Sequence, residues 1–243
     1  MGKIKGRYQS DNWNPWEGCR KCSEACKHCF LFPRLFGRDM DGARRCKTTW
    51  DKPWGWQKAA VAAGGRKTVG LCFCSDFLIE EADPWRQEAW ATIRDTPNLT
   101  WMFCSKRTKR LADCLPSDWG KGYPNVAIGA SFENKKHFDR IGYIQAVPAA
   151  FRFLDICPCL ENPAPELADH LDGIGLVSVS GERSTPDFRP LDLQWVRNVR
   201  DLCASRGIAF RFGHGAGREY HPSDLLDGKT YPGEVEFLKE VGM

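Results

Sequence analysis

The sequence predicts an α/β fold in which parallel strands form a partial (β/α)6-type barrel, similar to part of a TIM barrel. Short apolar runs rich in β-forming residues recur along the chain, and polar amphipathic segments of helical length separate them. Strands that alternate with helices favour a parallel sheet, because each helix returns the chain to the same edge. The strands are expected at 68–75, 99–105, 125–131, 151–157, 175–181 and 208–213.

The helices are expected before and between these runs. An alanine-rich stretch that ends at Gly64-Gly65 predicts a short helix, and residues 84–96 predict a second. Residues 192–207 predict a third, with Asp192 as its N-cap and Gly207 just past its end. A seventh short strand is expected before Cys19. The faces expected to be buried comprise Trp85, Ala89, Trp90 and Ile93 in the second helix and Leu193, Val196, Val199 and Leu202 in the third.

Length and composition indicate one cytoplasmic domain that spans residues 1–243. A chain of 243 residues can bury a core without disulfides, and no linker or fixed repeat divides it. The N-terminus lacks the apolar region of a secretory signal, and no apolar run is long enough to cross a bilayer, so no membrane association is expected. In a reducing compartment the 12 cysteines should stay free, which favours metal binding or catalysis.

The charge of the chain neither requires nor excludes a nucleic-acid partner. Lys and Arg number 35 against 31 Asp and Glu, which gives a net charge of +4. The densest basic run is SKRTKR, residues 105–110. A solvated helix start is a simpler interpretation of this run than a phosphate site.

Four cysteines, Cys19, Cys22, Cys26 and Cys29, lie within residues 13–30. The two CxxC knuckles of a zinc site are normally a dozen or more residues apart, whereas three residues separate them here. The ferredoxin order CxxCxxCxxxC also differs. From Cys22 the segment reads CxxxCxxC, the spacing with which radical S-adenosylmethionine (SAM) enzymes hold a 4Fe-4S cluster and leave one iron open to SAM. The spacing therefore favours an iron-sulfur cluster.

Polar side chains follow most of the predicted strands at their carboxyl ends, where barrel folds gather their functional groups. These residues are Ser75 and Asp76, Ser105 and Lys106, Ser131, Glu133 and Asn134, Gly181, Glu182 and Arg183, and His214. Among them the candidate catalytic residues are Asp76, Lys106, Glu133, Glu182 and His214. The candidate SAM-binding residues are Ser75, Asp76, Ser131, Glu133 and Asn134. The triplet SGE at 180–182 is similar to a SAM-binding motif of radical SAM enzymes, but it follows a late strand, so Glu182 is expected to be substrate-side or structural.

Two further cysteine pairs are candidates for a second metal or cluster site. Cys72 and Cys74 are two residues apart on a predicted strand and should share one face, as should Cys157 and Cys159 if that strand continues. Small buried side chains are the stronger interpretation, because free cysteine is among the most buried residue types.

The tryptophans divide into two groups. Trp54, Trp56, Trp85, Trp90 and Trp195 are expected in the core or in helix packing. Trp13 and Trp16 flank the cysteine segment, where bulky apolar groups would shield a cluster from water.

Six motifs occur in order along most of the chain. They are WNPWEGC with Cys26 and Cys29, CFCSDFLIEEADPWRQEAW (72–90), SKR (105–107), LPSDWGKGYPNVAIGASFEN (115–134), RFLDICPCLENP (152–163) and SGERSTPDFRPLDLQWVRNVRDLC (180–203). With these motifs the chain resembles a family of phage-associated and bacterial proteins of unknown function, radical-SAM-like and characterised by a three-cysteine motif.

The resemblance implies a radical-SAM-like partial barrel with a 4Fe-4S cluster and SAM as cofactors. The family motif is C-x6-C-x2-C, which selects Cys19, Cys26 and Cys29 as ligands, whereas the general radical-SAM spacing selects Cys22 in place of Cys19. The third ligand is therefore open between Cys19 and Cys22, with the resemblance favouring Cys19. The chain also departs from the family at Cys157, where a glutamate is usual.

Two hypotheses follow for the function. The first is a radical SAM enzyme that takes its electron from a reductant such as a flavodoxin or ferredoxin and forms a 5′-deoxyadenosyl radical. Its substrate is open, with nucleic acid or a nucleotide as one candidate. The second is a non-catalytic binding or regulatory protein of phage or bacterial origin, in which zinc or a closed cluster staples the N-terminal segment.

Overall fold

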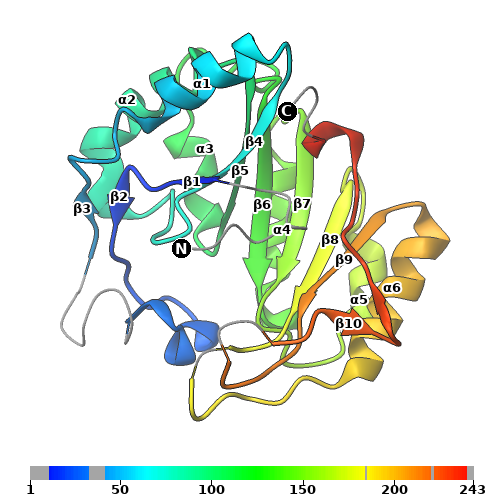
Figure 1. Ribbon diagram of the computed structural model, residues 1–243. Helices are drawn as coiled ribbons and strands as arrows, with labels where there is room; N and C mark the ends of the chain where they lie inside the picture. Colours follow the sequence, from blue (N-terminus) through cyan, green and yellow to red (C-terminus); the bar gives the residue numbers. More distant parts are fainter. Residues whose placement is uncertain (1–10, 33–41, 184, 220–221, 240–243) are drawn as a thin grey trace.

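The computed structural model describes residues 11–32, 42–183, 185–219 and 222–239. Its central feature is a seven-stranded parallel sheet in the order β1-β4-β5-β6-β7-β8-β9. The sheet curls into half of a barrel, and the helices lie along its outer face (Figure 1). The predicted α/β class and partial parallel barrel are thus confirmed at the level of the fold.

The strand positions agree closely with those expected from the sequence. The strands of the sheet are β1 Asp11–Trp13, β4 Lys67–Leu71, β5 Leu99–Ser105, β6 Val126–Phe132, β7 Phe151–Ile156, β8 Leu176–Ser180 and β9 Ala209–His214. The seventh strand expected before Cys19 is β1, which pairs with β4. Two small antiparallel pairs lie outside the sheet, β2 Trp16–Glu17 with β3 Arg44–Arg45 and β10 Leu225–Leu226 with β11 Lys229–Thr230.

The connections between strands are short helices. They are α1 Lys52–Ala62, α2 Asp83–Arg94, α3 Leu111–Cys114, α4 Asp139–Gln145, α5 Ala164–Leu167 and α6 Leu193–Arg206, with 3-10 turns at η1 Glu24–His28, η3 Glu80–Ala82, η4 Thr108–Arg110, η5 Lys135–His137, η6 Ala168–His170 and η7 Glu236–Leu238. No helix in the described part of the chain has the length and apolar character needed to cross a membrane.

The predicted ends of α6 are confirmed, and two predicted core residues are not. Asp192 accepts a hydrogen bond from the Gln194 N–H at 2.8 Å, and Gly207 has the left-handed φ of 64° typical of a helix end. Leu193 is 38% exposed, because it is the first residue of α6 and precedes the turn that contacts the sheet. Trp54 is 45% exposed, since α1 turns Pro53 and Ala60 inward instead.

The two faces of the sheet bury different groups. The outer face carries an apolar core beneath the helices, in which Trp101 and Phe103 of β5 are fully buried. The concave face is apolar only near the amino ends of the strands. There Leu238 of the C-terminal segment packs with Phe153, and the Phe237 ring stacks on Phe151 at 5.0 Å between centroids. The C-terminal segment thus fills the amino end of the half-barrel.

Asn125 joins three parts of the core. Its buried side-chain amide donates to the backbone carbonyls of Ile93 and Leu99 at 3.1 Å and of Thr96 at 3.3 Å. We expect Asn125→Ala to lower the free energy of unfolding by about 2–4 kcal/mol, because it removes three buried hydrogen bonds and leaves a small cavity. Urea denaturation measures this change. Gln194→Ala on the exposed side of α6 is the control, and an equal loss in both variants would contradict the expected role of Asn125.

Candidate functional site

The cysteine segment lies across the carboxyl ends of the strands. In Figure 1 the arrowheads of β6 and β7 point toward the end of the sheet at which η1, drawn in blue, is found. The loop after β4 fixes the start of the segment: the Gly18 N–H donates to the Cys74 carbonyl at 3.1 Å, and the Ser75 hydroxyl donates to the Gly18 carbonyl. The Cys74 N–H in turn donates to Asn14 Oδ1 at 2.8 Å.

The prediction that Cys72 and Cys74 share one strand face is wrong. Strand β4 ends at Leu71, and Cys72 has a φ of 64°, so the chain turns before Cys74. The same holds for the other pair, because β7 ends at Ile156, before Cys157 and Cys159. Cys72 and Cys159 are buried, as expected for small core side chains.

Asp76 is the buried acceptor that organises the loops after β4 and β5. Its Oδ1 accepts from the Ser105 hydroxyl at 2.6 Å, and its Oδ2 accepts from the Lys106 N–H and from Arg107 Nη1, both at 3.2 Å. With these contacts Asp76 is a positioning residue for the candidate site.

Arg107 connects this organising carboxylate to the cysteine segment. Its Nη1 lies 3.8 Å from Cys19 Sγ, and its Nη2 donates to the Arg20 carbonyl at 2.7 Å. Only 9% of the Arg107 side chain is exposed, and Arg110 pairs with Asp83 at 2.7 Å. The basic run 105–110 begins a helical turn as expected, since η4 covers Thr108–Arg110. It is not a solvated run, however, because Arg107 and Arg110 are engaged with the protein and only Lys109 among its cations is exposed.

Glu133, predicted as a catalytic or SAM-binding residue, holds η1. Its fully buried carboxylate accepts from the Ala25 N–H at 3.0 Å and pairs with Arg140 Nη1 at 3.2 Å. Burial alone would raise the pKa of Glu133, but the Ala25 hydrogen bond and the charges of Lys106 and Arg140 lower it below its usual value. A charged Glu133 therefore fixes the backbone of η1 one residue before Cys26.

A second glutamate holds the same turn from β8. Glu182 accepts from the Arg189 N–H at 2.7 Å and Nε at 3.0 Å, and its Oε2 lies 3.2 Å from His28 Nδ1. Arg189 also pairs with Glu24 at 3.2 Å, and Asn134 Nδ2 lies 3.4 Å from the other Glu24 oxygen. Both ends of η1 are thus tied to residues that follow β6 and β8, which agrees with the structural option predicted for Glu182.

Two of the four cysteines of the segment, Cys22 and Cys26, lie close together. Cys22 Sγ lies 4.0 Å from Cys26 Sγ, and the charge of Cys26 also raises the pKa values of Cys19 and Cys29 after the larger effect of burial. The hydrogen-bond contact with Cys22 and the charge of Lys106 lower the pKa of Cys26 itself. Cys22 and Cys26 are thus a closely interacting pair of thiols, of which Cys22 is the exposed member.

Lys106 lies between the cysteine segment and the concave face of the sheet. Its Nζ donates to Ser131 Oγ at 2.6 Å and to the Cys157 carbonyl at 3.1 Å. Burial opposes its charge, yet the neighbouring Cys157 and Cys26 thiols and the Asp155 carboxylate raise the pKa of Lys106 above its usual value. Lys106 and Ser131, both predicted from the sequence, thus meet at the carboxyl end.

Below Lys106 the concave face is polar. Asp155 of β7 lies 4.0 Å from Cys104 Sγ of β5, and Ser178 of β8 is its register partner. Burial raises the pKa of Asp155 against the opposing charges of Lys106 and Arg211. Asp155 is not among the site residues predicted from the sequence, although a lone acid inside a β-rich run is a usable signal. Nothing in the sequence pointed to Arg189.

His214 is the predicted catalytic candidate on the last strand of the sheet. It ends β9, where its carbonyl accepts from the Gly181 N–H at 2.9 Å and its Nδ1 lies 2.8 Å from the Gly215 carbonyl. The structure therefore brings seven of the eight predicted site residues into contacts at or beside the segment: Ser75, Asp76, Lys106, Ser131, Glu133, Asn134 and Glu182. Their catalytic or SAM-binding roles stay predictions.

The side chains do not assemble a finished metal site. Among the described residues no three Cys, His, Asp or Glu side chains converge closely enough to hold one ion, at residues 19–29 or at the second candidate pairs. All 12 cysteines are free thiols, as expected. Trp13 and Trp16 are fully buried beside the segment, with Trp16 Nε1 donating to the Asp76 carbonyl at 3.1 Å.

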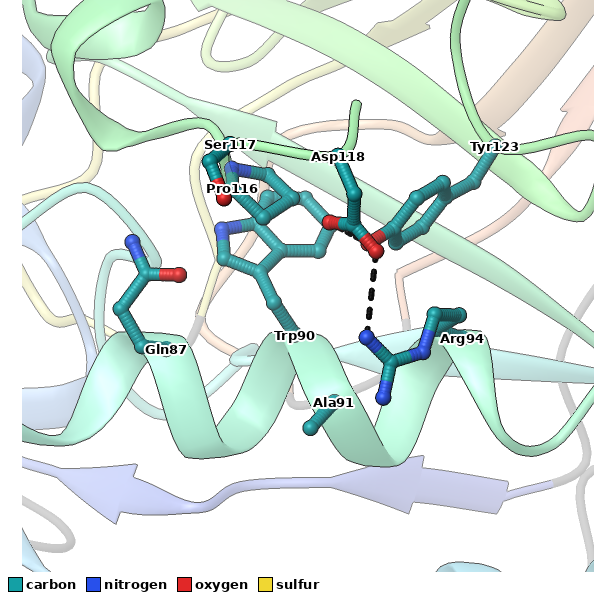
Figure 2. A pocket seen from close by; sticks show the side chains of 8 residues that line it. All are labelled: Gln87, Trp90, Ala91, Arg94, Pro116, Ser117, Asp118 and Tyr123. Carbon is teal, nitrogen blue, oxygen red and sulfur yellow. Dashed lines mark hydrogen bonds and ion pairs between the residues drawn. The ribbon is translucent and has the colours of Figure 1, made fainter. Parts of the chain in front are cut away.

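A separate surface pocket lies on the outer face, between α2 and the loop before β6 (Figure 2). It encloses about 300 Å³, and Asp118 in its wall pairs with Arg94 at 3.1 Å and accepts from the Tyr123 hydroxyl at 2.6 Å. Because that loop precedes β6, the pocket lies toward the amino ends of the strands, away from the cysteine segment.

Fold and site together define an α/β half-barrel protein with a thiol-rich segment across the carboxyl ends of its strands. The chain belongs to the family described as "Protein of unknown function (DUF5131)", whose model matches residues 3–234. No curated protein and no solved structure matches the chain.

The buried Glu133 generates a prediction about the cysteine segment. Glu133→Gln should lower the free energy of unfolding by about 2–4 kcal/mol, because it leaves buried Arg140 without its countercharge. Cys26 should also be alkylated faster, since η1 loses its charged acceptor. Urea denaturation and mass-spectrometric mapping of iodoacetamide labelling measure the two effects. Glu166→Gln, which removes an exposed pair with Lys135, is the matched control, and equal labelling rates in both variants would refute the positioning role.

Proposed function

We propose that this protein is an iron-sulfur enzyme that binds a 4Fe-4S cluster through three thiolates of the cysteine segment and uses SAM. The observation that carries the proposal is the placement of a CxxxCxxC segment over the carboxyl ends of a parallel half-barrel. Functional groups of barrel folds gather at this end. The family match itself assigns no activity.

The chemistry of the donor set fits such a cluster. Thiolates are the usual ligands of iron-sulfur clusters, and Cys26 has a lowered pKa among three further thiols. Lys106 and Arg107 supply positive charge beside them, which favours the anionic state that thiolate-ligated clusters have. When bound, the cluster would pass one electron from a reductant such as a flavodoxin or ferredoxin to SAM and release a 5′-deoxyadenosyl radical.

The protein residues would act by positioning and by excluding water. Glu133 and Glu182 hold the two ends of η1, and Asp76 holds Arg107 against Cys19. The buried Trp13 and Trp16 cover the inner side of the segment. Asp155 and Ser178 on the concave face lie where a substrate would approach the reactive centre, and we propose them as substrate-side residues.

A second candidate function, a zinc-stapled binding protein, rests on one distance. Two thiolates on one tetrahedral zinc ion are about 3.8 Å apart, given Zn–S bonds of about 2.3 Å. The 4.0 Å between Cys22 Sγ and Cys26 Sγ is close to that value. Thiolates on different irons of a cluster are held farther apart, because the metal ions lie between them.

Anaerobic reconstitution separates the two candidates. The purified protein is incubated with iron and sulfide, and its metals are counted together with the product of dithionite reduction in the presence of SAM. We expect about four irons per chain and formation of 5′-deoxyadenosine. Stoichiometric zinc with neither iron nor 5′-deoxyadenosine would exclude the radical enzyme and leave the zinc-stapled protein.

Single Cys→Ser variants identify the ligands. Cys26→Ser and Cys29→Ser should both lose the cluster, and only one of Cys19→Ser and Cys22→Ser should do so, since three thiolates leave one iron open. Iron content and the visible absorbance of the cluster measure retention. Cys203→Ser, at a buried position of α6, is the control. Full retention in both Cys19→Ser and Cys22→Ser would refute a three-cysteine site.

A further inference from the structure

The positive charge of the protein is concentrated beside the cysteine segment. We define the basic rim as residues 19–32 and 42–47. It holds six Lys and Arg against one acidic residue, Glu24, a net charge of +5, whereas the whole chain has +4. The remainder of the chain therefore sums to −1. The six cations are Arg20, Lys21, Lys27, Arg44, Arg45 and Lys47, and all six are exposed.

The two parts of the basic rim lie side by side. Strand β2, which leads into the cysteine segment, pairs antiparallel with β3, so that Glu17 faces Arg44. Gly42 lies so close to Arg20 that a Cβ on it would be 3.4 Å from Arg20 Nη2. In Figure 1 β2, β3 and the cysteine segment follow one side of the molecule. The two stretches that carry the cations thus adjoin each other at Gly42 and Arg20 and border the candidate site.

Part of this charge is balanced within the protein. Arg20 pairs with Glu81, and Arg45 pairs with Glu88 at 2.7 Å. Glu24, the carboxylate of the rim, is itself paired with Arg189. Lys21, Lys27 and Lys47, together with Arg44 opposite Glu17 in the β2–β3 pair, make up the rest of the positive charge, which attracts a polyanion.

Aromatic rings are interleaved with these cations. The Lys21 Nζ lies 5.2 Å from the centre of the Phe32 ring. The Phe30 ring, also in the rim, lies 5.1 Å from the guanidinium of Arg183, a cation outside the rim that follows β8. Cations beside aromatic rings bind single-stranded nucleic acid, because phosphates pair with the cations while unstacked bases stack on the rings. A lipid surface would instead require exposed apolar side chains. The large exposed apolar residues of the described chain, from Trp54 to Leu225, all lie outside the rim.

We propose that the basic rim binds single-stranded nucleic acid and presents one of its nucleotides to the candidate active site. This inference rests on the proposed function for the chemistry and deepens it by naming the substrate class. Binding of the strand itself requires no turnover. An enzyme that acts on a base needs that base unstacked, which a single strand provides without the cost of opening a duplex.

The test is fluorescence anisotropy of labelled oligonucleotides with the full chain across a series of salt concentrations. We expect binding of single-stranded DNA or RNA that is tighter than binding of the matching duplex. The plot of log K against log salt should have a slope of about −3, from four phosphate contacts at about −0.7 each. The triple variant Lys27→Gln, Arg44→Gln, Lys47→Gln should reduce this slope by about 2 and weaken binding by about tenfold or more at low salt.

A matched variant removes the same charge elsewhere. Lys58→Gln, Lys121→Gln, Lys229→Gln changes three exposed lysines outside the rim and should leave the slope unchanged. The double variant Arg44→Glu, Lys47→Glu leaves the cysteine segment intact and should abolish binding even if the triple variant misfolds. Equal losses in the two triple variants, or equal competition by poly-glutamate or anionic vesicles, would overturn the proposal.

The outcomes for the rim and for the reaction are separate. Strand binding by a protein that holds only zinc would support the rim and refute the radical enzyme. Formation of 5′-deoxyadenosine by a protein that binds no single strand would support the radical enzyme and refute the proposed role of the basic rim.

Discussion

The hydrogen bond from the Ala25 N–H to the buried Glu133 carboxylate is the contact on which the candidate site depends. It joins a 3-10 turn, which has little stability of its own, to the end of a fully buried strand. The carboxylate is costly to bury and is held charged by Arg140. Because Ala25 precedes Cys26, the position of the Cys26 thiol is determined by the residue that follows β6. Glu182, which follows β8, contacts His28 of the same turn, and Asp76, which follows β4, holds Arg107 beside Cys19. Residues at the ends of three strands thus determine where the thiols lie.

Much of the fold could be predicted from the sequence because the strands of a parallel sheet are buried on both faces. Such strands appear as continuous apolar runs, and residues 99–105 and 126–132 are examples with hardly an exposed side chain. The parallel direction also explains why polar residues distant in sequence could be grouped. Asp76, Lys106 and Glu133 each follow a strand, and parallel strands end at one edge. The two ends of α6 could also be predicted, because Asp192 bonds to a backbone N–H two residues away and Gly207 adopts a left-handed φ that glycine tolerates.

The parts that could not be predicted depend on local backbone turns and on the contacts that side chains make with distant loops. Cys72 continues an apolar run in sequence, but its left-handed backbone ends the strand, and no residue type signals that turn. Arg107 and Arg110 form a basic run that is typical of a solvated surface, yet carboxylates from other loops engage both of them. Glu133 and Glu182 lie after β6 and β8, as expected, and their described contacts include the backbone and side chains of the cysteine segment. A carboxylate that anchors a loop and one that performs chemistry have the same sequence signature.

The C-terminal segment that fills the amino end of the half-barrel gives the concave face two chemically different ends. Phe237 and Leu238 cover the end near Phe151 and Phe153 with apolar groups. Lys106 and the thiols lie at the opposite, carboxyl end. A charged or polar molecule therefore finds partners at the carboxyl end of the concave face and an apolar surface at the other.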